Sequence, residues 1–306
     1  MIRTVQGDLR RDQLGVTLVH EHLLNKAGRL VGDDDANLEE ADVVSAELAD
    51  AMSHGLRTLV EVSTFEMTRD IVGTLDIVRH LGLNLVLSTG FFCADFVPEN
   101  IRRAGVDYLF EAMLHDLCGE EPLAPRAGVI GEIGISPNGP TIWEQHIHEA
   151  AARAHRKTGC PIITHTFDGA QATEQAQMLI EFGVRPSAVL ICHVDADRPI
   201  DDHLAVLRNG VFVSLDRIGD HRRCDDEARA RRVLELFSRG YGHRVLLSHD
   251  LARRSRLKTY GGHGYGHLLT SFLPRLRRLG LEQSSIDQLT IHNPSHFLDW
   301  KREEES

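Results

Sequence analysis

The sequence predicts a (β/α)8 barrel, an α/β fold in which eight parallel strands form a ring surrounded by helices. Short apolar runs rich in β-branched residues alternate with longer amphipathic stretches along the whole 306-residue chain. Eight such runs recur, one roughly every 30 residues, as the repeating strand and helix of a barrel require. Because no linker or low-complexity segment interrupts them, we expect a single barrel domain over residues 1–306 with a C-terminal helical extension.

The apolar runs are the predicted parallel strands of this barrel. In chain order they are Val16–Val19, Leu56–Val62, Leu83–Ser88, Gly128–Ile133, Pro161–Thr164, Ala188–Cys192, Gly210–Leu215 and Arg244–Ser248. The amphipathic stretches between them predict helices at Leu38–Ser53, Asp70–Leu81, Thr141–Lys157, Gln171–Phe182 and Asp226–Arg239.

A doubly wound open sheet is the competing architecture, and it usually carries a glycine-rich phosphate loop after an early strand. No GxGxxG or Walker motif follows any of the predicted strands. The glycine-rich segment 261–266 comes after the last strand, where we expect a loop. These observations favour the closed barrel.

Composition excludes several classes of function. The net charge of −11 argues against a nucleic-acid partner, because binding to phosphate groups needs clustered Lys and Arg. The five cysteines are odd in number, widely spaced and without a CxxC pair, which favours reduced thiols in the cytoplasm. The N-terminus lacks the apolar region of a signal peptide, and no run approaches the length of a membrane span, so we expect no membrane partner.

The first predicted strand is followed by two histidines, His20 and His22, separated by one residue. On a strand, residues i and i+2 point to the same side, so both imidazoles can converge on one metal ion. Such a pair carries little weight alone in a chain with 18 histidines. Its weight comes from the residues that end the other strands.

Histidines and carboxylates also occur at the ends of four later strands, where the catalytic groups of a barrel gather. They are Glu132, His165, His193 and Asp250. Together with the first pair they exceed the ligands that one four- to six-coordinate ion needs, and two metals that share Glu132 as a bridge account for the number. We therefore predict a centre of two divalent ions, with Zn as the expected metal and Mn, Co or Fe as alternatives.

The segments that contain these residues follow one another in an order and spacing that resemble a known family. They are His20-Glu21-His22, Gly131-Glu132-Ile133-Gly134, Thr164-His165-Thr166, Cys192-His193-Val194-Asp195 and Leu247-Ser248-His249-Asp250, with a further similar stretch from Gly262 to Pro294. The sequence resembles the phosphotriesterase-related branch of the amidohydrolase superfamily over almost its whole length. In the phosphotriesterases proper the bridge on the fourth strand is a carbamylated lysine, whereas here the bridging position is Glu132.

The resemblance implies how the ligands are shared and how the reaction proceeds. His20, His22 and Asp250 would bind the more buried metal, His165 and His193 the more exposed one, and Glu132 would bridge them. A bridging hydroxide would attack a carbonyl carbon or phosphorus centre, and Asp250 would accept the proton. Glu132 and Asp250 are thus the expected catalytic residues.

Weaker predictions concern the surroundings of the metals. Asp195 could orient a metal ligand, relay a proton or cap a strand end. Arg217, after the seventh strand, is a candidate for holding a substrate oxygen. Arg254 belongs to a basic cluster after the eighth strand, with Arg253, Arg256 and Lys258, and this cluster could bind an anionic group or form a solvated loop. Phe92 is expected to line the pocket, and it lacks the hydroxyl of the tyrosine that several lactonases of the family carry there.

The leading interpretation is a cytoplasmic two-metal hydrolase that cleaves a lactone, carboxyl ester or phosphoester bond in a small-molecule substrate that could be anionic. An N-acyl amide hydrolase with the same site is the close alternative, and a metal-containing protein that binds a ligand without turnover is the more distant one. The fold alone does not choose among them. A homodimer is also left open.

Overall fold

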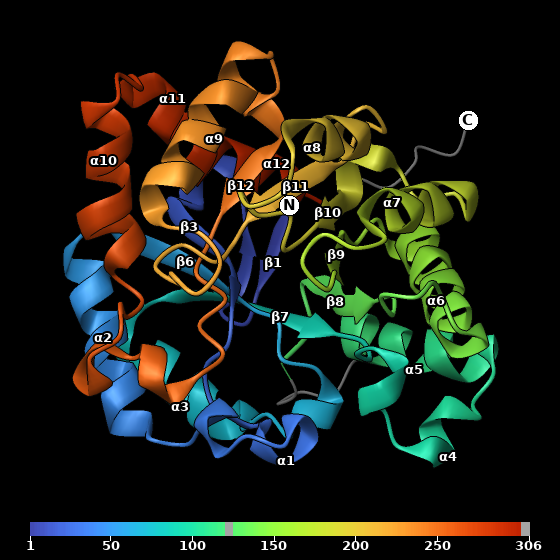
Figure 1. The fold of residues 1–306 in the computed structure, drawn as a ribbon. Coiled ribbons are helices and arrows are strands. Elements are labelled where there is room, and N and C mark those ends of the chain that lie inside the picture. Colours follow the sequence, from blue (N-terminus) through green and yellow to red (C-terminus); the bar gives the residue numbers. More distant parts are fainter. Residues whose placement is uncertain (120–124, 301–306) are drawn as a thin grey trace.

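The computed structural model describes residues 1–119 and 125–300, and its central sheet consists of eight parallel strands (Figure 1). Their spatial order is β12 (Val245–Leu247), β11 (Phe212–Leu215), β10 (Val189–Ile191), β9 (Ile162–His165), β8 (Val129–Gly134), β7 (Asn84–Thr89), β6 (Leu56–Glu61) and β3 (Val16–Glu21). All eight predicted strands are confirmed, with no boundary more than two residues from its prediction. The α/β barrel prediction is therefore correct.

Hydrogen bonds between the ends of the first and last strands complete the ring. The backbone N–H of Asp250 donates to the carbonyl of His20 at 3.1 Å, and the N–H of His20 donates to the Ser248 hydroxyl at 3.0 Å. That hydroxyl in turn donates to Glu21 Oε1 at 2.7 Å. Closure thus places two predicted metal ligands side by side.

Helices cover the outside of the barrel (Figure 1). They are α1 (Gly28–Val31), α2 (Ala41–Ser53), α3 (Ile71–Leu81), α4 (Glu99–Arg102), α5 (Val106–Cys118), α6 (Ile142–Thr158), α7 (Ala172–Glu181), α8 (Ile200–Leu207), α9 (Asp226–Ser238), α10 (Leu273–Arg278), α11 (Gln283–Asp287) and α12 (Asn293–Phe297). The five predicted helices occur, but α2 begins three residues later than predicted. Leu38 instead lies in strand β5 (Asn37–Leu38), which pairs antiparallel with β4 (Asn25–Lys26).

The hydrophobic core has two layers. One fills the space between strands and helices, and the other lies inside the ring with residues such as Val60, Ile163 and Leu246. Ile2 and Phe297, from the two ends of the described chain, pack on the inner layer. These residues cover the barrel at the amino-terminal ends of its strands. The interior is therefore accessible from the carboxyl ends of the strands.

A short antiparallel pair, β1 (Ile2–Thr4) and β2 (Gly7–Leu9), precedes the barrel. Helices α10 to α12 follow the last strand of the barrel. The predicted single domain over residues 1–306 includes positions 120–124 and 301–306, which lie outside the described residues, and it stays a prediction. Within the described part of the chain, no helix combines the length and apolar character that crossing a membrane requires.

Candidate metal centre

The carboxyl ends of the strands open into a cavity of about 600 Å³. Four of the six predicted metal ligands line this cavity, namely His22, Glu132, His165 and Asp250. The other two, His20 and His193, are at most 1% exposed and lie against the same carboxylates. The structure therefore brings all six residues together.

One half of the cluster surrounds the first strand end. His22 Nε2 lies 3.4 Å from Asp250 Oδ1 and 3.6 Å from Glu132 Oε1. His20 Nε2 lies 3.8 Å from Asp250 Oδ1 and 3.4 Å from Glu132 Oε2. Two imidazole nitrogens and oxygens of two carboxylates thus face a common point, a donor set that suits a borderline divalent ion such as Zn²⁺.

The other half lies across Glu132. His165 Nδ1 is 3.1 Å from Glu132 Oε2, and His193 Nε2 is 3.7 Å from the same oxygen. The two imidazole nitrogens are 3.0 Å apart. Since its carboxylate has one oxygen toward His22 and the other toward these two rings, Glu132 occupies the position that a bridging ligand requires.

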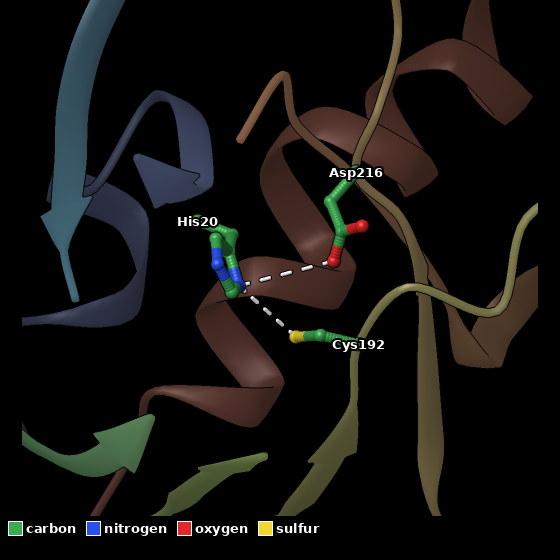
Figure 2. Close-up of side chains that lie close together, drawn as sticks. All are labelled: His20, Cys192 and Asp216. Carbon is green, nitrogen blue, oxygen red and sulfur yellow. Dashed lines mark hydrogen bonds and ion pairs between the residues drawn. The ribbon is translucent and has the colours of Figure 1, made fainter. Parts of the chain in front are cut away.

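The outward nitrogens of the imidazoles have partners of their own. His22 Nδ1 contacts the Ser63 hydroxyl at 2.8 Å, and His193 Nδ1 lies 2.8 Å from Asp216 Oδ1. His20 Nδ1 lies 3.2 Å from the thiol of Cys192 and 3.8 Å from Asp216 (Figure 2). Such contacts fix ring orientation and leave the opposite nitrogen for a metal.

His20 Nε2 is the clearest sign that this cluster holds a cation. This nitrogen is buried and has no hydrogen-bond partner within the described residues. A buried polar atom without a partner costs on the order of 1–3 kcal/mol. A metal ion bound between His20, His22 and Asp250 would satisfy it, so the residues present fit a metal centre.

The charges of the cluster also indicate a site for a cation. Burial raises the pKa of Glu132, but His20, His165 and His193 outweigh burial and hold this pKa well below its usual range. Burial lowers the pKa of His22, yet the hydrogen bond with Asp250 and the charge of Glu132 raise it to about 9. The two carboxylates therefore stabilise the protonated form of His22. A divalent cation that binds to this imidazole would displace the proton.

Backbone conformation also serves the cluster. Gly131 has a φ of +134°, and a Cβ at this position would lie 2.1 Å from the carbonyl oxygen of Ile163, so only glycine lets β8 approach β9 so closely beside Glu132. His193 and Asp250 adopt left-handed φ values of 60° and 51°. Such strained residues are typical of functional sites.

Asp195 does not contact the cluster, contrary to the suggestion that it orients a ligand. Its carboxylate, 1% exposed, accepts hydrogen bonds of 2.7 to 3.0 Å from the fully buried guanidinium of Arg229. Asp216, which the sequence reasoning did not select, has the orienting position and also accepts the backbone N–H of His193 at 3.1 Å. Its place directly after the seventh strand was the available signal.

The three substrate-side candidates differ in their positions. Phe92 lines the cavity, with its ring centroid 4.7 Å from that of His165. Arg217 also lines it, with Nε 3.7 Å from Asp250 Oδ2. Arg254 lies outside, where it pairs with Glu40 at 3.0 Å and stacks on Tyr260. Arg253 and Arg256, which belong to the same predicted basic cluster, do line the cavity, and sequence reasoning missed Arg222 and Arg223, which line it as well.

Comparison with known proteins places this arrangement in context. The model of the phosphotriesterase family matches residues 1–298. The phosphotriesterase homology protein of Escherichia coli is 36% identical over 94% of this chain and 99% of its own length, and its crystal structure superposes with a TM-score of 0.90 over 94% of this chain and all of that one. The N-acetyltaurine hydrolase of Bos taurus is 30% identical over 86% of this chain and 79% of its own length. A lactonase from Listeria monocytogenes is 25% identical, with a TM-score of 0.91 over 98% of this chain and 99% of that one.

Replacing Asp216 with asparagine should weaken metal binding. The variant keeps the size of the side chain but loses the charge that faces His193 and His20, and the loss of such an outer partner costs 10- to 100-fold in metal affinity. Competition with a chromogenic chelator measures the change. Asp197→Asn removes an exposed aspartate nearby and should leave the affinity as it is. Equal affinities in the two variants would contradict the role of Asp216.

Replacing Asp195 with asparagine should instead destabilise the fold without changing the number of bound metals. The substitution leaves the buried Arg229 without its main charged partner, which costs about 3–5 kcal/mol of unfolding free energy. Urea unfolding together with metal analysis separates the two effects. Asp202→Asn, which removes an exposed partner of Arg198, should cost no more than about 1 kcal/mol. Unchanged stability with reduced metal content would show that Asp195 supports the metals after all.

Proposed function

The chain belongs to the phosphotriesterase family and is a metal-dependent hydrolase, and from this premise we propose that it cleaves an ester-type bond in a small, negatively charged substrate. The bond is a lactone, carboxyl ester or phosphoester. The observation that carries the proposal is the joint lining of one cavity by the ligand cluster and five arginines. Two divalent ions, Zn²⁺ first among them, are part of the proposal.

The charge of the cavity argues for an anionic substrate. Arg217 and Arg223 both pair with the carboxylate of Asp168, and the guanidinium of Arg223 lies 2.5 Å from it. Arg222 and Arg256 share Asp220, each at 2.7 Å. Arg253 pairs with Asp33.

Arg217 also lies 3.7 Å from Asp250, so the five guanidinium groups have four aspartates as partners. The excess positive charge faces the cavity in a chain whose net charge is −11. Arginine binds carboxylate, sulfonate or phosphate oxygens through two parallel hydrogen bonds, so an anionic group on the substrate would restore the balance.

When bound, the two ions supply Lewis acidity that activates a water molecule and polarises the bond to be cleaved. Asp250 has one oxygen toward His20 and His22, and the other, beside Arg217, would accept the proton of the attacking water. Arg217 keeps that carboxylate oriented. Phe92 and Met67 line the apolar part of the cavity and exclude water from the acyl group.

Cleavage of an N-acyl amide is the second candidate. The bovine relative is named for the hydrolysis of N-acetyltaurine, an amide that carries a sulfonate, and the arginines of this cavity suit such a group. Ligand binding without turnover has less support, because all six ligand positions are filled and the structure brings them together.

A pair of matched substrates tests the proposal. 2-Acetoxyethanesulfonate and N-acetyltaurine share the acetyl and sulfonate groups and differ only in the ester oxygen or amide nitrogen. We expect the zinc-loaded protein to hydrolyse the ester faster, and Asp250→Asn to lower kcat by about 10²- to 10⁴-fold. Lactones and a phosphotriester extend the ester series. Faster hydrolysis of the amide would select the second candidate, and no turnover with two metals bound would support the binding protein.

The anionic group is tested on the same panel. Arg223→Gln should raise KM for 2-acetoxyethanesulfonate about tenfold or more, since a charged hydrogen bond is worth about 1.5–3 kcal/mol, and should spare the neutral 2-methoxyethyl acetate. Arg254→Gln, outside the cavity, is the matched control and also tests the prediction made for that residue. A loss confined to Arg254→Gln, or equal losses on both substrates, would contradict the assignment of the cavity arginines.

A further inference from the structure

A second group of imidazole and carboxylate side chains lies outside the cavity of the metal centre. His221 belongs to the loop between β11 and α9, Asp226 is the first residue of α9, and His267 directly precedes the π-helix at Leu268–Phe272. One ligand atom from each lies within 4.8 Å of the others. His267 Nε2 is 2.7 Å and His221 Nε2 3.8 Å from the same oxygen, Oδ2 of Asp226.

The carboxylate of Asp226 is held in a fixed orientation. Its Oδ1 accepts the backbone N–H of Gly219 at 2.9 Å and a guanidinium N–H of Arg229 at 3.2 Å. The side chain is 2% exposed, and its Oδ2 faces the two imidazoles. Burial raises the pKa of Asp226, but the hydrogen bonds from His267 and Gly219 outweigh it, so this carboxylate is ionised at neutral pH. One oxygen is therefore positioned and charged for a further ligand bond.

Solvent reaches the two histidines from one side. His221 and His267 line a separate cavity of about 550 Å³, and the side chain of His221 is 58% exposed. An ion can enter there, and a water can fill a fourth coordination position beside the three protein ligands. Two histidines and one carboxylate with an open position form a common ligand set for zinc.

We propose that His221, Asp226 and His267 form a third divalent-cation site, separate from the hydrolytic centre, with Zn²⁺ as its preferred ion. Imidazole nitrogen and carboxylate oxygen suit Zn²⁺ better than Mg²⁺ or Ca²⁺, which favour oxygen alone. The site does not depend on the reaction assigned to the cavity.

The position of this site indicates what it does. The loop from β11 to α9 carries Arg217, Arg222 and Arg223 into the main cavity. His267 lies beyond β12, so an ion shared with His221 and Asp226 fastens this loop to the last part of the barrel. The ion thus stabilises the loop that presents three of the cavity arginines.

Zinc stoichiometry tests the proposal. Purified protein is dialysed against buffered Zn²⁺ at increasing free concentration, and bound zinc is measured by plasma mass spectrometry. We expect wild type to bind three equivalents, and His221→Gln and His267→Gln to lose the third while keeping two. His80→Gln, which alters an exposed histidine on α3, should keep three. A wild type that saturates at two, or a third equivalent that survives in both site variants, would overturn the proposal and leave His267 and Asp226 as an ion pair.

Trypsin provides a second readout that is independent of activity. Arg222 and Arg223 are accessible cleavage sites, with side chains 62% and 43% exposed. Raising Zn²⁺ from the concentration that gives two equivalents to the one that gives three should slow cleavage after these residues in wild type but not in His221→Gln. Because His221 is exposed, its variant is expected to fold, and circular dichroism checks this. Equal cleavage rates at the two zinc concentrations in wild type would show that no ion fastens the loop.

Discussion

The carboxylate of Glu132, whose side chain is only 3% exposed, lies within 3.1–3.7 Å of an imidazole nitrogen from each of four histidines. Burying this charge is favourable only if positive charge surrounds it. In the protein alone, His22 and His193 provide that charge, because neighbouring carboxylates outweigh burial and raise their pKa to about 9 and about 10, and divalent ions would provide more of it. Gly131, directly before Glu132, lets β8 approach β9 closely, and both groups of ligands face this one carboxylate.

Buried carboxylates outside the ligand cluster, Asp216 and Glu21, hold neighbouring parts of the barrel in place. Asp216 contacts His193 directly and lies near His20, so one side chain orients a ligand in each half of the centre. Glu21 performs a comparable task at barrel closure, where it accepts from Ser248 and from the backbone N–H groups of His249 and Leu251. Buried carboxylates thus hold the segments that follow β10 and β12, and this rigidity is what a preorganised hydrolytic site requires.

Much of the fold and of the ligand cluster could be predicted from the sequence, because the end of each strand can be located from a short stretch of residues. A buried parallel strand is a short apolar run, and the residues that follow it must lie at the mouth of the barrel, which is how His20, Glu132 and His193 could be placed together. Helix α5 was not among the predicted helices, although Leu109, Phe110, Met113 and Leu117 follow a helical period. The contacts of Asp195 and Arg254 could not be predicted, since their partners Arg229, Glu40 and Tyr260 come from distant segments and side-chain pairing depends on the folded geometry. The homodimer and the cytoplasmic location stay predictions.

The central claim is that Glu132 joins two metal subsites in one hydrolytic centre. Anomalous diffraction at the zinc edge, from crystals of the zinc-loaded protein, tests it most directly. We expect two peaks about 3.5–4 Å apart at the ligand cluster, one beside His22 and Asp250 and the other beside His165 and His193, with an oxygen of Glu132 on each. A single peak within this cluster, or a Glu132 carboxylate that contacts only one ion, would contradict it.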